Sequence, residues 1–544
     1  MQKLIMKTIS CLEKILPNKS PSLIEKENYC LKNEVFSFQV AYYNANREWF
    51  SSFCNLIIDS DIKDFIQIRY VENVMCQTPT LNKNDDYYLT LKKEIIPDIL
   101  KDDLPLIIRL KTWQSIWITI KGNLPIGKHN IIFTIKDYDN NILGKTSYTL
   151  NVIDNNLPKS NLYYTNWFHY DSIASYYKLK PFSKKYNQVM WNFIDNAISH
   201  GLNTLLVPLF TLPLDTAVGK ERITCQLLDI SFDNNIYTFN FDRLLTFMNK
   251  AKELGIKMFE MAHLFSQWGA KFAPKVIVKV NGKNKKMFGW KVKAEDERYL
   301  NFVKQLLLAL VPFLKEHGFD KNQVIFHLSD EPNCNHLKHY LYLKSIIKPL
   351  LGDYLICDAL SNYEYYTNNA VDRPVVATNE AKPFIENNVE NYWAYYCCSQ
   401  CDNHLSNRFI SMPLLRCRII GIQLYLTNAK GLLHWGYNFY NSALTKRYIN
   451  PYLVNDADGM FQSGDSFIVY PKDDGTCYDS IRHETMLDAF QDYRLLTLLE
   501  SKIGKDKVIS LLLESGFKKD FTTYPRNNKT FIELRKNIIL MLQK

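Results

Sequence analysis

The chain has 544 residues, which is more than one ordinary domain of roughly 100–200 residues, so we expect more than one structural unit. Hydrophobic residues make up 47% and charged residues 22%, a balance typical of a globular protein with a large core. The net charge of +10 is dispersed without a basic run, which argues against a nucleic-acid-binding protein. No apolar segment reaches the roughly 18 residues of a membrane-spanning helix, so we expect no such helix.

The amino-terminal segment MQKLIMKTISCLEKILPNKSP does not resemble a secretory signal. Its Lys and Glu residues interrupt any apolar stretch, and it has no small-residue cleavage site. Twelve cysteines are scattered through the chain and do not form the dense framework of a small disulfide-rich domain. Both features favour a cytoplasmic protein.

Residues 1–154 contain short segments in which apolar and polar residues alternate, as they do in strands with one buried face. Turn residues such as Gly122, Asn123 and Pro125 separate them. The pattern predicts an amino-terminal β-sandwich, followed by a linker at 155–158. The expected strands are Val35–Asn44, Ser115–Asn123, His129–Asp137 and Thr146–Asp154.

Beyond residue 155 the apolar spacing changes to that of helices. Apolar residues from Tyr186 to Ile198 fall on one helical face, and Gly201 and an apolar strand follow. The same order of helix, glycine and strand recurs with Gly255 and again with Gly318, which indicates βα units with parallel strands. We therefore predict an α/β fold with a TIM-type (β/α)8 barrel over 155–500 and a helical extension over 501–544. The eight expected strands are Asn161–Tyr170, Asn203–Phe210, Ile256–Phe265, Val324–Leu328, Tyr354–Leu360, Pro374–Asn379, Asn391–Tyr396 and Gly431–Asn438.

The carboxyl ends of these strands, where the active sites of such barrels lie, are rich in polar and aromatic residues. One aromatic residue at a strand end is more often part of the core, but the collection predicts a carbohydrate pocket. By strand alternation Trp435 and Tyr437 share a face and should pack against the sugar, while His434 takes the other face. The candidate substrate-binding residues are Asn166, Trp167, His169, His263, Trp268, Tyr395, Tyr396, His434, Trp435, Tyr437 and Asn438.

The stretch VIFHLSDEPN places two adjacent acids, Asp330 and Glu331, directly after an apolar strand. One interpretation is a helix start, where acids suit the helix dipole and Pro332 suits the first turn. A second is a metal site, but the chain has no HxH or HExxH pattern. A separate cluster, Cys397, Cys398, Cys401 and His404, has one CxxC without a second pair at zinc spacing. We therefore expect no metal and no cofactor.

The third interpretation is glycoside hydrolysis. A conventional retaining glycosidase sets two carboxyl groups about 5–5.5 Å apart across the scissile bond, usually from different strands. Adjacent acids instead suit substrate-assisted catalysis, in which the 2-acetamido oxygen of the sugar attacks its own anomeric carbon. One acid then protonates the leaving oxygen while its neighbour orients the acetamido group. Asp358, at the end of the following strand, is the rival candidate for a conventional nucleophile.

Three motifs resemble those of glycoside hydrolase family 123. They are HLSDEP at 327–332, GLLHWGYNFY at 431–440, and GDSFIVYP at 464–471 together with SIRHETMLDAFQDYRLL at 480–496. The resemblance spans roughly 155–500 and implies an exo-acting, retaining β-N-acetylgalactosaminidase. It implies that Asp330 orients the acetamido group, that Glu331 is the general acid/base, and that Trp435 and Tyr437 line the sugar pocket. The segment KDDGTCYDS at 472–480 departs from the glycine-rich sequence usual in the family at this place, which leaves the leaving-group preference open.

Two alternatives stay open at this point. The enzyme could act on another 2-acetamido sugar such as β-linked N-acetylglucosamine, since the partner of the 4-hydroxyl is not identifiable from sequence. The chain could also be a non-catalytic carbohydrate-binding barrel, although the presence of both Asp330 and Glu331 argues against this. The expected partner is an oligosaccharide or glycoconjugate substrate, and the sequence does not indicate an oligomeric state.

Overall fold

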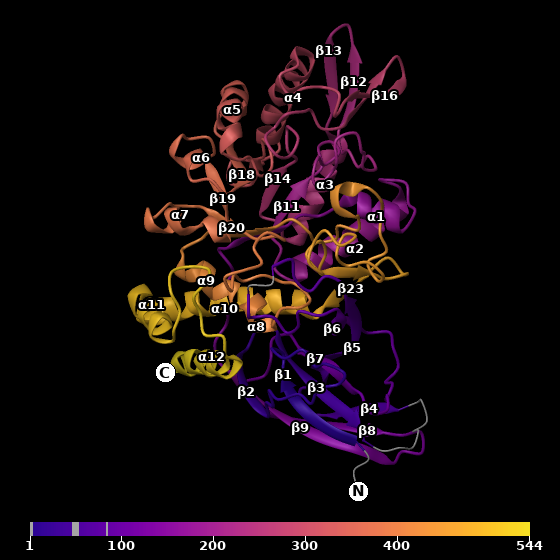
Figure 1. Cartoon of the computed structure of the whole chain (residues 1–544), viewed down its shortest axis with the longest axis vertical. Helices are drawn as coiled ribbons and strands as arrows, with labels where there is room; N and C mark the ends of the chain where they lie inside the picture. The colour runs from indigo at the N-terminus through magenta and orange to yellow at the C-terminus, as the bar shows by residue number, and fades with distance from the viewer. Residues whose placement is uncertain (1–3, 46–53, 83–84, 544) are drawn as a thin grey trace.

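The computed structural model describes residues 4–45, 54–82 and 85–543. Figure 1 shows the amino-terminal strands at one end of the molecule, a barrel with its surrounding helices at the other, and the carboxy-terminal helices beside the junction. In the described residues no helix combines the length and the apolar character needed to cross a membrane.

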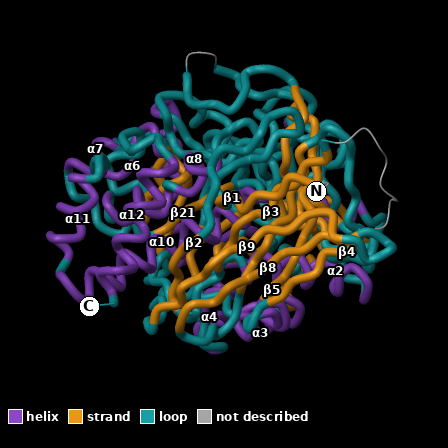
Figure 2. Tube along the Cα trace, turned by 90° about the horizontal axis from the view of Figure 1, so that it is seen from below, coloured by secondary structure: helices purple, strands orange, loops and turns teal. Residues whose placement is uncertain are grey.

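The amino-terminal region is a sandwich of two sheets, as predicted, with a core of Phe, Ile, Val and Leu side chains between them. Figure 2 shows these strands running across the near face of the molecule when it is seen from below. The larger sheet has the order β1-β3-β7-β5-β6-β23-β22 and the smaller one the order β2-β9-β8-β4. Their strands within the first 154 residues are β1 Leu4–Ser10, β2 Glu27–Leu31, β3 Phe36–Asn44, β4 Asn55–Asp59, β5 Ile66–Cys76, β6 Glu94–Lys101, β7 Trp113–Ile120, β8 Gly127–Lys136 and β9 Ile142–Ile153.

Eight parallel strands close into a barrel, and this confirms the predicted fold class. Each strand overlaps one of the eight segments expected from the sequence, because strands buried on both faces appear as short apolar runs. The strands are shorter than those segments, so most of the polar ends lie in loops. The barrel strands are β10 Tyr163–Asn166, β11 Thr204–Val207, β14 Met258–Met261, β17 Val324–Phe326, β18 Leu355–Leu360, β19 Arg373–Ala377, β20 Trp393–Tyr395 and β21 Gly431–His434.

Three long helices with one apolar face each pack around the barrel. Ser183 caps the start of the first of them, and its side chain accepts a hydrogen bond from the Tyr186 amide. Gly255 ends the second in a left-handed conformation with φ of 115°, which glycine adopts without a steric penalty. The helices outside the carboxy-terminal region are α1 Tyr170–Tyr176, α2 Lys184–Ser199, α3 Asp242–Leu254, α4 Glu297–Glu316, α5 Leu337–Leu351, α6 Glu364–Thr367, α7 Lys382–Glu386, α8 Leu414–Arg418 and α9 Ile420–Leu426, with short 3₁₀ turns at Lys63–Phe65, Cys334–His336, Thr378–Glu380 and Ala443–Thr445.

An accessory sheet, which the sequence reading did not anticipate, is inserted into two of the barrel loops. It has the order β13-β12-β15-β16. Its first two strands lie between β11 and α3, and the other two lie between β14 and α4. Figure 1 shows this sheet projecting beyond the barrel at the end far from the sandwich. Its strands are β12 Asp229–Asp233, β13 Ile236–Asn240, β15 Val276–Val280 and β16 Lys283–Phe288.

The segment after the last barrel strand returns to the amino-terminal sheet. Strand β23 (Cys477–Ser480) pairs with β6 and with β22 (Val469–Pro471), so the larger sheet contains residues from both ends of the chain. Helix α10 (Ile481–Ile503) follows and crosses the boundary expected at 500/501. Its buried face shares a core with α8, α9, strands of the sandwich, α11 (Lys505–Glu514) and α12 (Asn528–Leu542).

Candidate active site

A cavity of about 250 Å³ opens at the carboxyl ends of the barrel strands. Residues from seven different strands or the loops after them form its wall, so the barrel itself fixes their relative positions. Its lining residues are Trp167, Leu214, Asp215, Gln267, Trp268, Asp330, Glu331, Ala359, Tyr395, Cys397, Cys398, Ser399, Leu433, Trp435 and Phe461.

The two adjacent acids both line this cavity, and the backbone conformation explains how they do so. In an extended chain, successive side chains point to opposite sides. Glu331 has a φ of 41°, in the left-handed region that non-glycine residues rarely occupy. This turn interrupts the alternation directly after Asp330, so neighbouring carboxyl groups reach the same space. A left-handed conformation at a non-glycine residue such as Glu331 is strained, and functional sites often retain such strain.

The loop after β14 holds the acids from one side. The amide of Trp268 donates a 2.7 Å hydrogen bond to the carbonyl oxygen of Asp330. One residue earlier, the hydroxyl of Ser329 donates to the carbonyl of Ser266 at 2.8 Å and accepts from the amide of Ala270 at 3.1 Å. These contacts fix the backbone of the acid pair independently of their carboxyl groups, which remain available to a ligand.

Burial and mutual repulsion raise the pKa of both carboxyl groups. The pKa of Asp330 lies well above its ordinary value because of burial and then because of the nearby charges of Glu331 and Asp358. Burial likewise raises the pKa of Glu331, while hydrogen bonds from Tyr395 and Trp268 act in the opposite direction. Two interacting carboxyl groups titrate as a pair. The pair therefore retains a proton under conditions in which an exposed carboxyl group has lost it.

A fully buried layer of polar side chains lies beneath the acids. His327 lies between two carboxylates, with Nε2 at 3.1 Å from Glu260 and Nδ1 at 3.0 Å from Asp358. Burial alone would lower the pKa of His327, but Cys357, Asp358 and Glu260 together raise it well above its ordinary value. A cationic imidazole between two carboxylates gives each of the three groups a partner of opposite charge. Buried charges need such partners, because burial removes them from water.

Asp358 is committed to this layer and does not line the cavity. Its Oδ2 accepts hydrogen bonds from the amides of Leu328 at 3.2 Å and Ser329 at 3.0 Å and from the hydroxyl of Tyr340. Its side chain is completely buried. The carboxylate thus orients the backbone that leads into Asp330, and it lies outside the cavity in which the conventional nucleophile considered from the sequence would be expected.

The structure brings six of the residues predicted from sequence together at the cavity and places the others elsewhere. Both acids line it with four aromatic residues, Trp167, Trp268, Tyr395 and Trp435. The indole of Trp435 donates to Asp465 at 3.0 Å, and Tyr395 donates to Glu331 at 2.9 Å. The predicted residues that do not line it are Asn166, His169, His263, Tyr396, His434, Tyr437 and Asn438.

All seven of these residues are buried and pack around the site. His169 contacts Trp435 through a 2.8 Å interaction between its Nε2 and the Trp435 carbonyl, and Asn438 caps the His169 amide at 2.7 Å. Buried Arg408 lies 2.6 Å from His434 and 3.5 Å from Asn166. The other three are also buried: His263 stacks on His327, Tyr396 contacts Met486, and Tyr437 contacts Phe193 and Asn196.

The position of Tyr437 corrects the expectation that it joins Trp435 against a sugar. Its hydroxyl lies within hydrogen-bond distance of two acceptors on helix α2, the Phe193 carbonyl at 2.9 Å and Oδ1 of Asn196 at 2.8 Å. Strand β21 ends at His434, so alternation no longer governs the residues that follow. Trp435 alone of this pair lines the cavity.

The comparison with protein families decides the class of this site. The model described as glycoside hydrolase 123, catalytic domain, matches residues 167–499, which is more than half of the chain. The chain belongs to glycoside hydrolase family 123. The matched region contains seven of the eight barrel strands, both acids and the cavity, so the chain is a hydrolase of glycosidic bonds. No curated protein matches the chain.

A solved structure from the same family shares the fold of this chain. A family 123 glycoside hydrolase from Clostridium perfringens has a TM-score of 0.73 at 15% identity, and the match covers 99% of this chain and 98% of the other. The match to a β-glucuronidase from Parabacteroides merdae has a TM-score of 0.32 at 11% identity, and it covers 90% of this chain and 52% of the other.

The polar residues of the family 123 site that were missed from the sequence include Asp215 and Gln267. Burial raises the pKa of Asp215 to about 6 despite the 2.9 Å hydrogen bond that its Oδ2 accepts from the Leu444 amide. Gln267 donates to the Thr216 carbonyl at 3.0 Å, and its buried Oε1 has no protein partner in the described residues. Both lie in loops beyond strand ends, where no periodic pattern identifies them. A substrate hydroxyl or amide could satisfy each of them.

Several residues near the family 123 site are of the types that bind metals. His263, His327 and Asp358 bring ligand atoms within 4.8 Å of one another, and so do Glu260, His327 and Cys357. Both nitrogens of His327 are already taken up by carboxylates, so this arrangement fits an ion pair better than a metal centre.

The cysteine cluster considered from the sequence is divided between two places. Cys397 and Cys398 line the cavity. Cys401 packs with Phe409 and Met412, and His404 lies 2.6 Å from Asp86.

Proposed function

We propose that this chain is an exo-acting, retaining β-N-acetylgalactosaminidase that uses the 2-acetamido group of its substrate as the nucleophile. The observation that carries the proposal is the presence of Asp330 and Glu331, neighbours in sequence, in one cavity of about 250 Å³. Neighbouring carboxyl groups serve adjacent atoms of one sugar more readily than opposite faces of its anomeric centre. The relative from Clostridium perfringens was described in work on glycolipid glycan hydrolysis, which is consistent with a glycan substrate here.

In the proposed mechanism Glu331 donates its proton to the glycosidic oxygen while the acetamido carbonyl oxygen attacks the anomeric carbon. The C–O bond to the leaving group breaks, and a cyclic oxazolinium ion forms. Asp330 accepts a hydrogen bond from the acetamido N–H and stabilises the developing positive charge. Glu331 then removes a proton from water, which attacks the same anomeric carbon and opens the ring. Two inversions give net retention. The raised pKa of Glu331 favours the protonated form that the first step needs.

The shape of the cavity supports exo action on a single sugar ring. Its volume of about 250 Å³ lies below the roughly 300 Å³ at which pockets for drug-sized ligands begin. Trp167, Trp435 and Phe461 contribute aromatic rings to its lining, and Leu433 contributes an aliphatic side chain. Aromatic rings of this kind pack against the apolar face of a pyranose. Asp215 and Gln267 are the candidate partners of its ring hydroxyls.

Asp215 is the remaining competitor for a conventional mechanism, since it is the other carboxyl group that lines the cavity. Its pKa of about 6 reflects burial, which suits a hydrogen-bonding group better than a fully ionised nucleophile. A trapping experiment separates the two mechanisms. Substrate assistance predicts inhibition by a thiazoline mimic of the bicyclic intermediate, no labelling by a 2-fluoro sugar, and no turnover of the plain β-galactoside. A covalent glycosyl adduct on Asp215 would refute the proposal.

The choice between galacto and gluco configuration is tested with nitrophenyl glycosides. We expect the β-N-acetylgalactosaminide to be hydrolysed with the higher kcat/KM. A higher value for the β-N-acetylglucosaminide would retain the mechanism and change the substrate. Replacement of Gln267 by Glu, which changes one polar atom next to the Thr216 anchor, should alter the ratio of the two values if this residue contacts a ring hydroxyl.

A further inference from the structure

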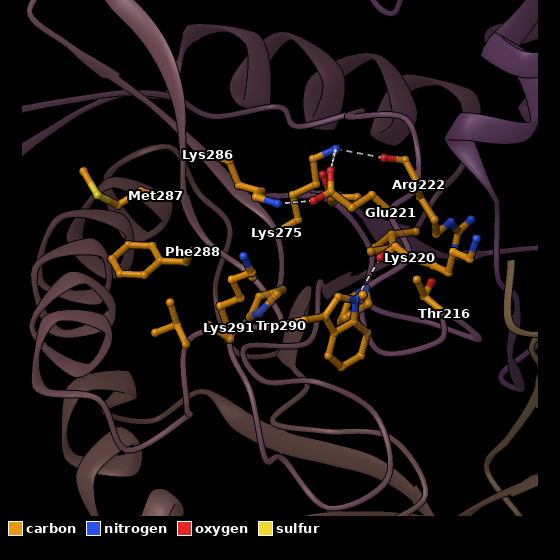
Figure 3. Close-up of a pocket in the computed structure, with 18 residues that line it drawn as sticks. Thr216, Lys220, Glu221, Arg222, Lys275, Lys286, Met287, Phe288, Trp290 and Lys291 are labelled. Carbon is orange, nitrogen blue, oxygen red and sulfur yellow. Dashed lines mark hydrogen bonds and ion pairs between the residues drawn. The ribbon is translucent and has the colours of Figure 1, made fainter. Parts of the chain in front are cut away.

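A second cavity, of about 270 Å³, lies beside the active site. Figure 3 shows side chains from two walls ranged around it. One wall is the segment from Thr211 to Arg222, between β11 and β12. The other consists of Ala273–Lys275 and the segment from Lys286 to Val292 at the end of the accessory hairpin. The cavity therefore exists because the accessory sheet is present in these two barrel loops.

The same two loops line both cavities. Leu214 and Asp215 line the active site, while the residues on either side of them line the second cavity. In the other loop, Gln267 and Trp268 line the active site. A hydrogen bond of 3.0 Å from Gln267 to the carbonyl of Thr216 joins the two loops at the boundary. A group linked to the bound sugar would thus extend out of the active site at a point next to the second cavity.

Positive charge predominates around the second cavity. Glu221 pairs with both Lys275 and Lys286, as Figure 3 shows, so a single carboxylate serves two ammonium groups. Lys220 and Lys291 are exposed, and neither side chain has a hydrogen bond or an ion pair within the described part of the chain.

Arg222 adds no free charge to this cavity. Its guanidinium pairs with the carboxylate of Asp171, which lies behind the wall, and also contacts His169 at 2.8 Å. The lining of this cavity therefore has one carboxylate, that of Glu221, to balance four ammonium groups. These belong to Lys220, Lys275, Lys286 and Lys291.

The floor of the second cavity is apolar. Phe288 and Val292 are buried, and the half-buried Trp290 is held in place by a hydrogen bond of 2.9 Å from its indole to the Lys220 carbonyl. An aromatic ring beneath lysine side chains presents one surface for the C–H face of a pyranose and another for an anionic substituent. A simple inorganic anion would leave this apolar surface unused.

We propose that the second cavity binds an acidic sugar, one with a carboxylate or a sulfate ester, located on the leaving-group side of the substrate. The proposal has two parts. The binding of an acidic sugar does not require hydrolysis and goes beyond the proposed function. Its attachment to the substrate rests on the proposed function, because the active site must hold the neighbouring hexosamine.

Calorimetric titration of the full chain with small probes tests the binding. The probes are methyl β-glucuronide and galactose 6-sulfate, with methyl β-galactoside as the neutral control, and none of them has an acetamido group. We expect at least one acidic probe to bind about tenfold more tightly than the neutral one, with an affinity that falls as salt is raised. The tighter of the two acidic probes identifies carboxylate or sulfate as the natural group. Equal affinities for all three probes would overturn the proposal.

Charge reversal locates the binding. The double variant Lys220→Glu/Lys291→Glu should lose about tenfold in affinity for the acidic probe, since each exposed ion pair is worth up to about fivefold and the reversal adds repulsion. The control is Lys285→Glu, an exposed lysine of β16 that lies outside the cavity lining. Unchanged affinity in the double variant, or an equal loss in the control, would place the probe elsewhere and refute the assignment.

Kinetics test the link to the substrate. The double variant should hydrolyse a nitrophenyl hexosaminide with a kcat/KM within about twofold of wild type. On a pair of oligosaccharides that differ only in an acidic group on the sugar next to the cleaved bond, wild type should prefer the acidic member and the variant should not. If wild type shows no preference although the free acidic probe binds, the ligand is not part of the substrate. If no hexosaminide is cleaved, the proposed function fails, but the titration still decides on the acidic-sugar site.

Discussion

The hydroxyl of Tyr395 donates a 2.9 Å hydrogen bond to Oε1 of Glu331. The donor ends strand β20 and the acceptor lies in the loop after β17, so the contact crosses the mouth of the barrel. Burial and the nearby Glu331 charge raise the pKa of Tyr395 well above its ordinary value, and the phenol therefore stays protonated as a donor. The proton affinity of Glu331 is thus partly set by a residue on another strand.

Replacement of Tyr395 by Phe should move the alkaline limb of the kcat/KM profile to higher pH. The hydrogen bond stabilises the ionised form of Glu331 and so lowers its pKa, and its loss must raise that pKa. A hydrogen bond to a charged group is worth roughly 1.5–3 kcal/mol, which corresponds to a shift of about one to two pH units. The control is Tyr396→Phe, because that hydroxyl contacts Met486 and not the acids. A limb that moves to lower pH would contradict the assignment.

Replacement of Glu331 by Gln should abolish most turnover of substrates with poor leaving groups. General acid catalysis contributes about 10²- to 10⁴-fold, and a nitrophenolate leaving group needs little of it. The loss in kcat/KM should therefore be much larger for an alkyl or sugar leaving group than for an activated aryl group. Equal losses for the two classes would show that Glu331 does not act as the acid.

Replacement of Asp330 by Asn should lower kcat with a smaller effect on KM. The positive charge that the carboxylate stabilises develops in the transition state, so its removal affects the chemical step more than ground-state binding. Steady-state kinetics on the nitrophenyl hexosaminide would measure this. Wild-type kcat in the variant would remove Asp330 from the mechanism.

Replacement of Asp358 by Asn should reduce kcat by about 10²-fold through misplacement of the acid loop. The asparagine side chain has one oxygen and no charge. It cannot both accept the hydrogen bonds from the Leu328 and Ser329 amides and form the ion pair with His327. Sodium azide separates this role from catalysis, because a small anion can replace a missing nucleophile but not a missing anchor. Azide should therefore fail to restore turnover, and formation of a glycosyl azide would instead indicate a nucleophilic Asp358.

Replacement of Arg482 by Met should destabilise the fold by about 3–5 kcal/mol, because it leaves the carboxylate of Asp98 buried without its partner. Burial alone would raise the pKa of Asp98, but the charge and hydrogen bonds of Arg482 hold it below its ordinary value. The stabilisation is therefore present above the unfolded-state pKa of about 3.9 and disappears as the pH falls through the lower folded-state pKa.

Urea unfolding at pH 7 and pH 4 would measure this effect. Without Arg482, burial raises the pKa of Asp98 in the folded variant, so at pH 4 the variant buries a neutral carboxyl group and the penalty should be smaller than at pH 7. The double variant Arg482→Met/Asp98→Leu removes both charges and should recover much of the loss at pH 7. If the single variant is as stable as wild type at pH 7, the buried pair does not stabilise the junction.

The barrel was predictable because its strands are short apolar runs that alternate with helices of regular spacing. The accessory sheet was not, since strands such as β16, with the sequence KNKKMF, are mostly exposed and lack an alternating pattern. The pairing of β23 with β6 joins Ser480 to Ile99, and no local pattern in either segment specifies such a distant partner.

The site was predictable to the extent that strand ends identify it. The two acids and three of the aromatic residues follow from their positions at or just beyond the ends of strands, and Trp268 lies in the loop after β14. His434, Asn166 and His169 have similar positions, but buried arginines engage them, and Arg408 and Arg222 lie far away in the sequence. Asp215 was missed because it reaches the cavity from within a long loop.

The pairing of β23 with β6 has a consequence for the order of synthesis on the ribosome. Strand β6 emerges early, but the partner for one of its edges is made only after the whole barrel has been translated. Until then the apolar strand EIIPDILK exposes unpaired backbone groups that other chains can bind. Pro97 within it has no backbone N–H to donate. A nascent chain that stalls before residue 480 would therefore be prone to aggregate, and the sandwich would reach its final form only when synthesis is nearly complete.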